Sequence, residues 1–409
     1  MNDRSPESVI DRIRSAIGAQ AVLTAATDIE PYIVDWRGVY RGAAAAVVRP
    51  ANTAEVAAVM RICAETGTPV VPQGGNTGMC GASVPGGPRE VVLSLARMNK
   101  VLAVDPLNNT ITVEAGCVLA TIQQAAAEAD RLFPLSLGAE GTLGIITAAT
   151  LKLFPRPAAN ATAWMAVPDP EAALKLLALM RKHCNDRITA FELISRHSLE
   201  LVWRHIPGTR DPIATPYSWY VLTELADSAD EPKLRGDLER ALEEAIAEGL
   251  VSDAVIADNR SQAQALWHMR ESIPEGARQE PYMVYRHDIA VAVGRIPEFI
   301  REAQAALEAR FAGVQLICFG HLGDGNLHYN AYIPERLRTD AAARDAHDVT
   351  ETVYDIVQRY GGSFSAEHGI GLSKVAELAR YKSAVELDLM RTVKRALDPQ
   401  GLMNPGKLF

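Results

Sequence analysis

The dipeptide Asp324-Gly325, with a histidine on each side of it, constrains the fold of this chain more than any other short feature. Asp-Gly between apolar, β-prone residues is typical of a two-residue hairpin turn. Such a turn places His321 opposite His328, with Cβ atoms about 4.5–5.5 Å apart on one face. Two imidazoles at that spacing can hold one metal ion. A histidine in a strand is, however, more often an ordinary core or surface residue, and the sequence alone leaves both interpretations open.

Further polar residues are expected near the same hairpin. Asn330 lies two residues after His328 and therefore shares its face of the strand. The later dipeptide Glu367-His368 offers a carboxylate ligand and a titratable base. Together these residues predict a site in which a cation, a base and an amide converge.

Length and charge limit the classes of function. The 409 residues favour two or three domains, and 48% hydrophobic residues are ample for packed cores. A formal charge of −9 without a basic stripe argues against a nucleic-acid partner. The five cysteines form no CxxC pair and favour a reducing cytoplasm. We expect a soluble protein, with peripheral membrane contact through a partner left open.

Two patterns of secondary structure follow one another along the chain. Up to residue 157, short strands surround the glycine loop Gln73–Gly78 and a second glycine-containing stretch that begins at Glu140. Glycines without Cβ atoms let the backbone wrap an anion closely, although such a loop is often only a tight turn. Residues 158–335 alternate strands with helices and predict an antiparallel sheet with helices on one face, an α+β layer. Residues 336–409 are predicted to be mainly helical and to end in a helix at about Val385–Leu397.

In combination, these motifs resemble the FAD-linked oxidases of the vanillyl-alcohol oxidase/PCMH class. The resemblance rests on Pro72–Gly78, Asn109–Gly116, Gly141–Thr147 and Asn404–Lys407. The histidine hairpin, Glu367-His368 and Trp267–Glu271 narrow it to the D-2-hydroxyacid dehydrogenase branch. That branch contains D-lactate dehydrogenases, the glycolate oxidase catalytic subunit and D-2-hydroxyglutarate dehydrogenases.

The resemblance implies a role for each matching residue. It implies oxidation of a small D-2-hydroxy acid, with FAD and a divalent metal, usually zinc, as cofactors. The electron acceptor (a quinone, a cytochrome or a flavoprotein) and a homodimeric state stay open. The implied FAD contacts are Pro72, Gly74, Gly75, Asn76, Thr77, Gly78, Gly144, Ile145 and Asn404; the metal ligands are His321, His328 and Glu367; the base is His368; the substrate contacts are Arg270, Arg286 and Asn330.

The chain departs from this family pattern in two places. Arg286 stands where relatives commonly have lysine, which keeps the charge but changes its geometry. At Gly138-Ala139 the chain lacks a second flavin-holding loop and several dozen further residues, so the second FAD subdomain is expected to be truncated. We expect this loss to uncover the apolar faces of Val91–Leu95 and Thr110–Val113 and to leave FAD bound weakly or not at all.

Two alternatives to the dehydrogenase therefore remain at this point. One is a non-catalytic remnant that binds a metal or carboxylates. The other is a metal-dependent hydrolase that uses the two histidines and Glu367 with a bound water.

Overall fold

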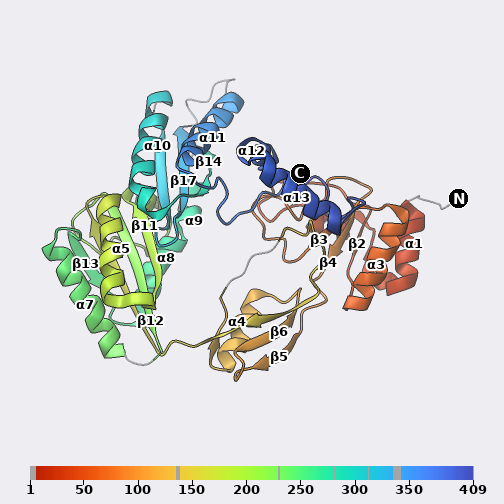
Figure 1. Cartoon of the computed structure of the whole chain (residues 1–409), viewed down its shortest axis with the longest axis horizontal. Coiled ribbons are helices and arrows are strands. Elements are labelled where there is room, and N and C mark those ends of the chain that lie inside the picture. The colour runs from red at the N-terminus through yellow and green to blue at the C-terminus, as the bar shows by residue number, and fades with distance from the viewer. Residues whose placement is uncertain are drawn as a thin grey trace. The chain divides into compact units, whose positions relative to one another are not determined.

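The structure, a computed structural model, describes residues 6–134, 139–228, 231–280, 282–311, 313–334 and 342–408. It divides into two compact units. The first comprises Met1–Arg156 and His368–Phe409, and the second comprises Pro157–Glu367. The first division falls one residue from the expected boundary at 157/158, whereas the expected C-terminal segment 336–409 is shared between the two units. Figure 1 shows the helices and strands of each unit.

The first sheet of the first unit carries the glycine loop. Its strands lie in the order β1 (Val22–Leu23), β2 (Ala46–Val48), β4 (Val91–Ser94) and β3 (Val70–Gln73), with β2 and β3 parallel to β4. Helices α1 (Pro6–Ile17) and α3 (Thr53–Thr66) pack on it through an aliphatic core. The side chain of Asn52 caps α3 by accepting a hydrogen bond from Glu55 N at 2.9 Å.

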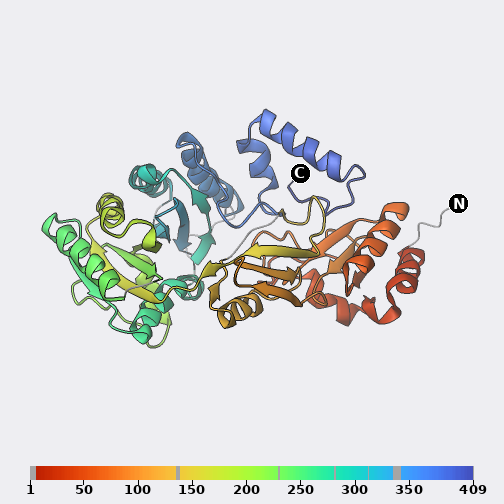
Figure 2. The ribbon, with the colours of Figure 1, turned by 60° about the horizontal axis from the view of Figure 1, so that its bottom comes forward.

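The second sheet of this unit is small and antiparallel. It contains β5 (Val101–Asp105), β6 (Thr110–Glu114) and β8 (Ala148–Lys152), with helix α4 (Leu119–Glu128) beside them (Figure 2). The short strands β7 (Arg131–Leu132) and β9 (Phe154–Pro155) pair next to it. Ile111, Val113 and Ile122 form its core together with Phe133 and Leu153.

The expectation of uncovered apolar faces in this unit is wrong. Every residue of β4 is buried, and in β6 the side chains of Ile111 and Val113 are at most 3% exposed. Strand β8 pairs with β6, and α4 covers the core of the small sheet, so the apolar side chains are enclosed by elements that the chain retains. The junction at Gly138 lies outside the described residues.

The second unit is built on one antiparallel sheet. Its path is β13 (Asp253–Ile256), β10 (Ala159–Val167), β12 (Trp219–Asp227), β11 (Ile188–Ser195), β16 (Gln315–His321), β17 (Asn326–Pro334) and β14 (Tyr282–Tyr285), and β15 (Asp288–Ala290) also pairs with β17. Helices α6 (Arg196–His205), α8 (Arg260–Glu271) and α9 (Ile273–Arg278) share one core with Trp164 and Ala166 of β10. The alternate residues of β10, Met165 and Val167, are fully buried as well.

Helices therefore cover both faces of this sheet, and the expected one-sided layer is wrong. The second layer contains α5 (Pro170–Cys184), α7 (Glu231–Ala247) and α10 (Ile296–Arg310), with α11 (Ala342–Arg359) packed on α10. Asp169 caps α5 by accepting from Ala172 N, and Pro170 occupies its first turn, where the missing N–H of proline costs no hydrogen bond.

The C-terminal segment completes the first unit. Helices α12 (Val375–Tyr381) and α13 (Ala384–Leu397) are followed by a stretch that pairs Met403 with Val70 of β3. Ser383 and Glu386 form a capping box at the start of α13. The predicted helix at Val385–Leu397 is confirmed. Among the described residues, no helix has the length and hydropathy needed to cross a bilayer.

Candidate active site

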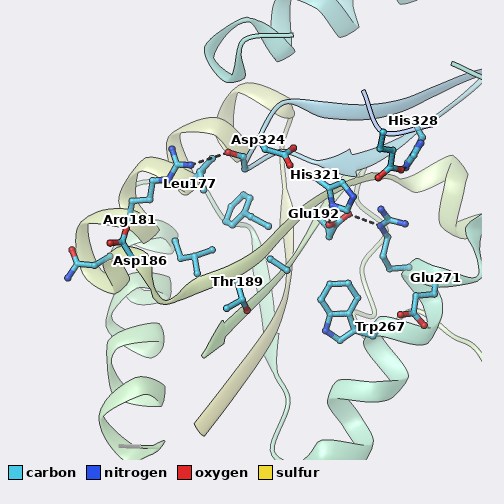
Figure 3. Close-up of a pocket in the computed structure, with 17 residues that line it drawn as sticks. Leu177, Arg181, Asp186, Thr189, Glu192, Trp267, Glu271, His321, Asp324 and His328 are labelled. Atoms are coloured by element: carbon cyan, nitrogen blue, oxygen red, sulfur yellow. Dashed lines mark hydrogen bonds and ion pairs between the residues drawn. The ribbon is translucent and has the colours of Figure 1, made fainter. Parts of the chain in front are cut away.

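A cavity of about 1070 Å³ opens at one end of the large sheet, and all of its lining belongs to the second unit (Figure 3). Strand β11, helix α8 and the β16–β17 hairpin contribute most of its walls. Ligand pockets commonly enclose about 300–1,000 Å³, so this space can admit a small acid together with water or a cation. Its polar lining residues include Arg181, Glu192, Trp267, Arg270, Glu271, His321, Asp324, His328 and Glu367.

The hairpin has a different register from the predicted one. His321 pairs with Asn326, so the turn contains the four residues from Leu322 to Gly325, and His328 pairs with Phe319. Gly325 has φ +88°, and a Cβ atom there would lie 2.2 Å from Val291 O, so this wider turn depends on glycine. His321 and His328 therefore do not face each other directly. They are diagonal neighbours on one face, with ring centroids 6.4 Å apart.

A buried carboxylate, Glu192, lies between two of the predicted site residues. Its Oε1 is hydrogen-bonded to Nδ1 of His321, and its Oε2 accepts from Nε of Arg270 at 2.7 Å. Figure 3 shows Glu192 beside His321 at the wall of the cavity. Burial opposes ionisation of this carboxyl, but the hydrogen bond to His321 and the charge of Arg270 hold its pKa below the ordinary value. The same hydrogen bond raises the pKa of His321.

Arg270 is placed to bind an anion. It lies in the last turn of α8, where its guanidinium carbon is 4.8 Å from the centroid of the Phe319 ring. Its side chain is 11% exposed, in contrast to the solvated arginine that helix position alone would suggest. Within the described residues, Nε is the guanidinium nitrogen that carries a hydrogen bond. The two Nη groups are thus available for a carboxylate.

Ligand-type atoms gather beside His328. The Nε2 atom of His328 lies 3.2 Å from Oε1 of Glu367. Four residues each offer one ligand atom, and these atoms lie within 4.8 Å of one another. The four are Asp288, His328, Glu367 and the chain neighbour of Glu367, His368. Carboxylate oxygens and imidazole nitrogens are ligands that Zn²⁺ accepts, so the donor set fits a divalent metal. His321, a predicted ligand, is outside this compact group.

Asp288 is a member of this group that sequence reasoning missed. Its side chain is 1% exposed and accepts from Nδ2 of Asn326 at 2.9 Å and from the backbone N–H of Glu367 at 2.9 Å. The carboxylate of Asp288 therefore fixes the backbone of Glu367 next to β17. The sequence signal was a lone acid inside an otherwise apolar strand, Asp288–Ala290, because a buried acid requires partners.

The other predicted substrate contacts lie outside the cavity lining. The Oδ1 atom of Asn330 accepts from the backbone N–H of His287 at 3.2 Å, so this amide supports the strand next to Arg286. Arg286 is exposed and forms a hydrogen bond with Tyr332. Their roles toward a substrate stay predictions.

The first unit holds a second large cavity, of about 920 Å³, at the predicted cofactor loops. Pro72, Gly74, Gly144 and Ile145 line it, whereas Gly75, Asn76, Thr77 and Gly78 do not. A Cβ atom at Gly74, Gly78 or Gly144 would meet no atom within 4 Å, so the backbone there is open to a ligand. The side chain of Asn76 instead supports the loop, because Nδ2 donates to Val34 O at 2.8 Å and Oδ1 accepts from Ser83 Oγ at 2.7 Å.

Asn404 and Glu140 join the remaining segments around this cavity. Asn404 is 1% exposed, and its Nδ2 donates to Ala82 O at 2.9 Å and to Glu140 O at 2.6 Å. Its Oδ1 is buried and has no hydrogen-bond partner among the described residues. The carboxylate of Glu140 accepts from the N–H groups of Ile370 and Gly371 at 2.7 and 2.8 Å. An open glycine loop and an orphaned buried acceptor fit a cofactor with polar groups, as FAD has.

Solved structures with the same architecture define the class of fold. The chain is similar to p-cresol methylhydroxylase with substrate bound, with a TM-score of 0.75 and 15% identity over 98% of this chain and 96% of that one. It is also similar to 4-ethylphenol oxidase from Gulosibacter chungangensis in its isoeugenol complex, with a TM-score of 0.67 and 17% identity over 100% of this chain and 97% of that one. The fold is the PCMH-type FAD-binding fold.

Sequence comparison then gives the family. Residues 156–408 match the C-terminal domain of FAD linked oxidases, and residues 44–150 match an FAD binding domain. The chain belongs to the FAD-linked oxidase family, which is a family of oxidoreductases.

Curated relatives cover nearly the whole chain. D-2-hydroxyglutarate dehydrogenase of Xanthomonas citri pv. viticola is 32% identical over 463 aligned positions, which include 97% of this chain and 96% of that protein. D-2-hydroxyglutarate dehydrogenase of Stutzerimonas stutzeri is 29% identical over 471 aligned positions, which include 98% of this chain and 99% of that protein. Both alignments are longer than the 409 residues of this chain, so these relatives contain segments that it lacks. This agrees with the internal deletion that the sequence indicates.

Proposed function

We propose that this protein oxidises a D-2-hydroxy acid to the 2-oxo acid, with D-2-hydroxyglutarate as the first substrate to test. The observation that carries the proposal is the cavity of the second unit. There Arg270 offers a pair of Nη donors that have no hydrogen-bond partner among the described residues, close to imidazole and carboxylate groups suited to a divalent cation. The names of the relatives point to the same class of substrate.

Each residue has a role in this proposal. Arg270 holds the substrate carboxylate through its two Nη groups and so orients C2, which presents its single hydrogen for removal in only one enantiomer. His368 accepts the proton of the substrate hydroxyl. His321, His328 and Glu367, with Asp288 beside them, would hold a divalent metal, which lowers the pKa of the substrate hydroxyl. Bound FAD would supply the acceptor for the hydride of C2, and the products would be the 2-oxo acid and reduced flavin.

A second candidate function is favoured by one observation. The alignments with two relatives are longer than this chain, and we infer that the segments it lacks include a flavin-holding loop of the cofactor cavity. In this second reading the protein binds a metal or carboxylates in the second unit without redox turnover.

Turnover with added flavin tests the two candidates. The purified chain, with FAD and Zn²⁺ in excess, is assayed for reduction of an artificial dye by D-2-hydroxyglutarate, D-lactate and their L-enantiomers. We expect reduction by a D-acid and none by its enantiomer. Absence of turnover with every acid, together with retained Zn²⁺ binding, would support the second candidate.

A matched pair of arginine variants tests how the substrate is held. Arg270→Lys keeps the charge but loses the paired Nη donors, so KM for the acid should rise by at least about tenfold. Arg204→Lys is the control, because Arg204 also pairs with a glutamate and lies outside the cavity. Equal KM values in the two variants would exclude Arg270 as the carboxylate contact.

A further inference from the structure

The carboxylate of Glu192 contacts both a predicted metal ligand and the predicted substrate arginine. Its two oxygens are divided between them, Oε1 toward His321 and Oε2 toward Arg270. The backbone fixes this arrangement, because Glu192 and His321 are directly paired across β11 and β16. At 1% exposure, the carboxylate has no solvent that could replace either partner.

We propose that Glu192 is a positioning residue that sets the tautomer of His321 and the orientation of Arg270. This inference rests on the proposed function and adds a residue to which neither the sequence pattern nor the relatives assign a role.

Glu192 determines which nitrogen of the His321 ring carries the proton. A carboxylate only accepts hydrogen bonds, so the Nδ1 atom that contacts it must carry the proton. In the neutral ring, Nε2 then keeps its lone pair and can coordinate a cation. A carboxylate behind a histidine is the usual arrangement by which proteins orient metal-binding imidazoles.

Glu192 also orients the guanidinium of Arg270. The bond from Nε to Glu192 and the ring of Phe319 at 4.8 Å fix the plane of the group from two directions. Both Nη groups are left to the cavity that Arg270 lines. A fixed fork loses little conformational freedom when a carboxylate binds, which favours the bound state.

An amide at this position could satisfy only one of the two partners. Gln has one acceptor oxygen and one NH₂ donor. If the oxygen serves Arg270, the NH₂ faces His321 and favours the tautomer with the proton on Nε2, which leaves no lone pair on Nε2 for a metal. If the oxygen serves His321, the NH₂ faces the Nε–H of Arg270 and displaces the guanidinium.

The test compares Glu192→Gln with Glu280→Gln in the full chain. Glu280 is a matched control, because it also accepts from an arginine and contacts a histidine, Arg204 and His205, but lies outside the cavity. Zn²⁺ affinity is measured by competition with a chelator, and KM for the acid is measured with excess FAD. We expect Glu192→Gln to weaken Zn²⁺ binding about 10- to 100-fold and to raise KM, with Glu280→Gln unchanged in both. Wild-type values of both quantities in Glu192→Gln would overturn the proposal.

A spectroscopic measurement separates this inference from the proposed function. In ¹⁵N NMR of the chain without added metal, at an alkaline pH at which the ring is neutral, the His321 signal, assigned with His321→Ala, should show the proton on Nδ1 in the wild type. This readout needs neither turnover nor folding of the Gln variant. A wild-type signal with the proton on Nε2 would overturn the role of Glu192 even if the protein oxidises the acid. The expected tautomer in a protein without turnover would sustain that role and refute the oxidation.

Discussion

Glu140 is expected to stabilise the segment that follows His368 through hydrogen bonds to its backbone. The variant Glu140→Gln measures the free energy of that stabilisation. The carboxylate accepts from two consecutive N–H groups, those of Ile370 and Gly371. Each hydrogen bond to a charged group contributes about 1.5–3 kcal/mol, and the half-buried position of Glu140 places it at the lower end. Gln keeps one acceptor and turns an NH₂ toward the other N–H. We therefore expect a local loss of about 2 kcal/mol, which corresponds to about 30-fold.

Amide hydrogen exchange reports this change directly. The amides of Ile370 and Gly371 should exchange about 30-fold faster in Glu140→Gln than in the wild type. The control is Glu114→Gln, because Glu114 accepts from a single backbone N–H, that of Lys100, and Gln retains an acceptor for it. Unchanged exchange of both amides in a folded Glu140→Gln protein would refute the reasoning.

Three further predictions concern the first unit. The chain purified without added FAD should carry less than one flavin per chain by visible absorbance, because relatives have segments that it lacks; full occupancy after desalting would contradict this. Gly371→Ala should lower the free energy of unfolding by about 2–5 kcal/mol, because φ is +53° and the new Cβ would lie 2.2 Å from Cys80 O. The control is Gly249→Ala in the second unit, where φ is +71° and the new Cβ meets open space, so the free energy of unfolding should fall by only about 1–2 kcal/mol. Equal losses for the two variants in denaturant titrations would be inconsistent with a clash at Gly371. Burial opposes ionisation of Asp398, but Lys394 and two backbone N–H groups lower its pKa. The stabilisation from Asp398 is therefore complete above the ordinary carboxyl pKa and is lost as the pH falls through the lower pKa of the folded state. Asp398→Asn should accordingly make the free energy of unfolding less dependent on pH on the acid side.

The elements of the fold were more predictable than the contacts between them. Caps and periodicity locate α5 and α13, since these signals are local. The turn of the histidine hairpin was mispredicted because its width depends on the close approach of Gly325 to Val291, which directly follows β15 and lies far from the hairpin in the sequence. Turn chemistry alone could not supply that contact.

Glu192 and Asp288 were missed for a related reason. The partners of Glu192 come from α8 and β16, which follow it by many residues and meet it only because β11 lies next to β16 in the sheet. Asp288 likewise acquires its role from the later segment at Glu367. A single acid within a buried strand was the available signal, and it indicates that a partner exists without identifying it.

The prediction of exposed apolar side chains in the first unit was wrong because it assumed that no remaining element would pack over them. The small sheet closes with β8 on β6, and α4 encloses Ile111 and Val113. A shortened domain can thus keep its apolar core buried when the remaining strands pair with one another. Its effect on ligand affinity is a separate question, which flavin content addresses.

The discontinuity of the first unit has a consequence for synthesis of the protein. The stretch from His368 to Phe409 is synthesised after the whole second unit, yet Met403 pairs with Val70 and Asn404 donates to Ala82. The strands of the first unit therefore stay incompletely covered until that stretch has been made, while the intervening unit can already fold. A premature stop shortly before His368 would consequently damage the unit that was synthesised first.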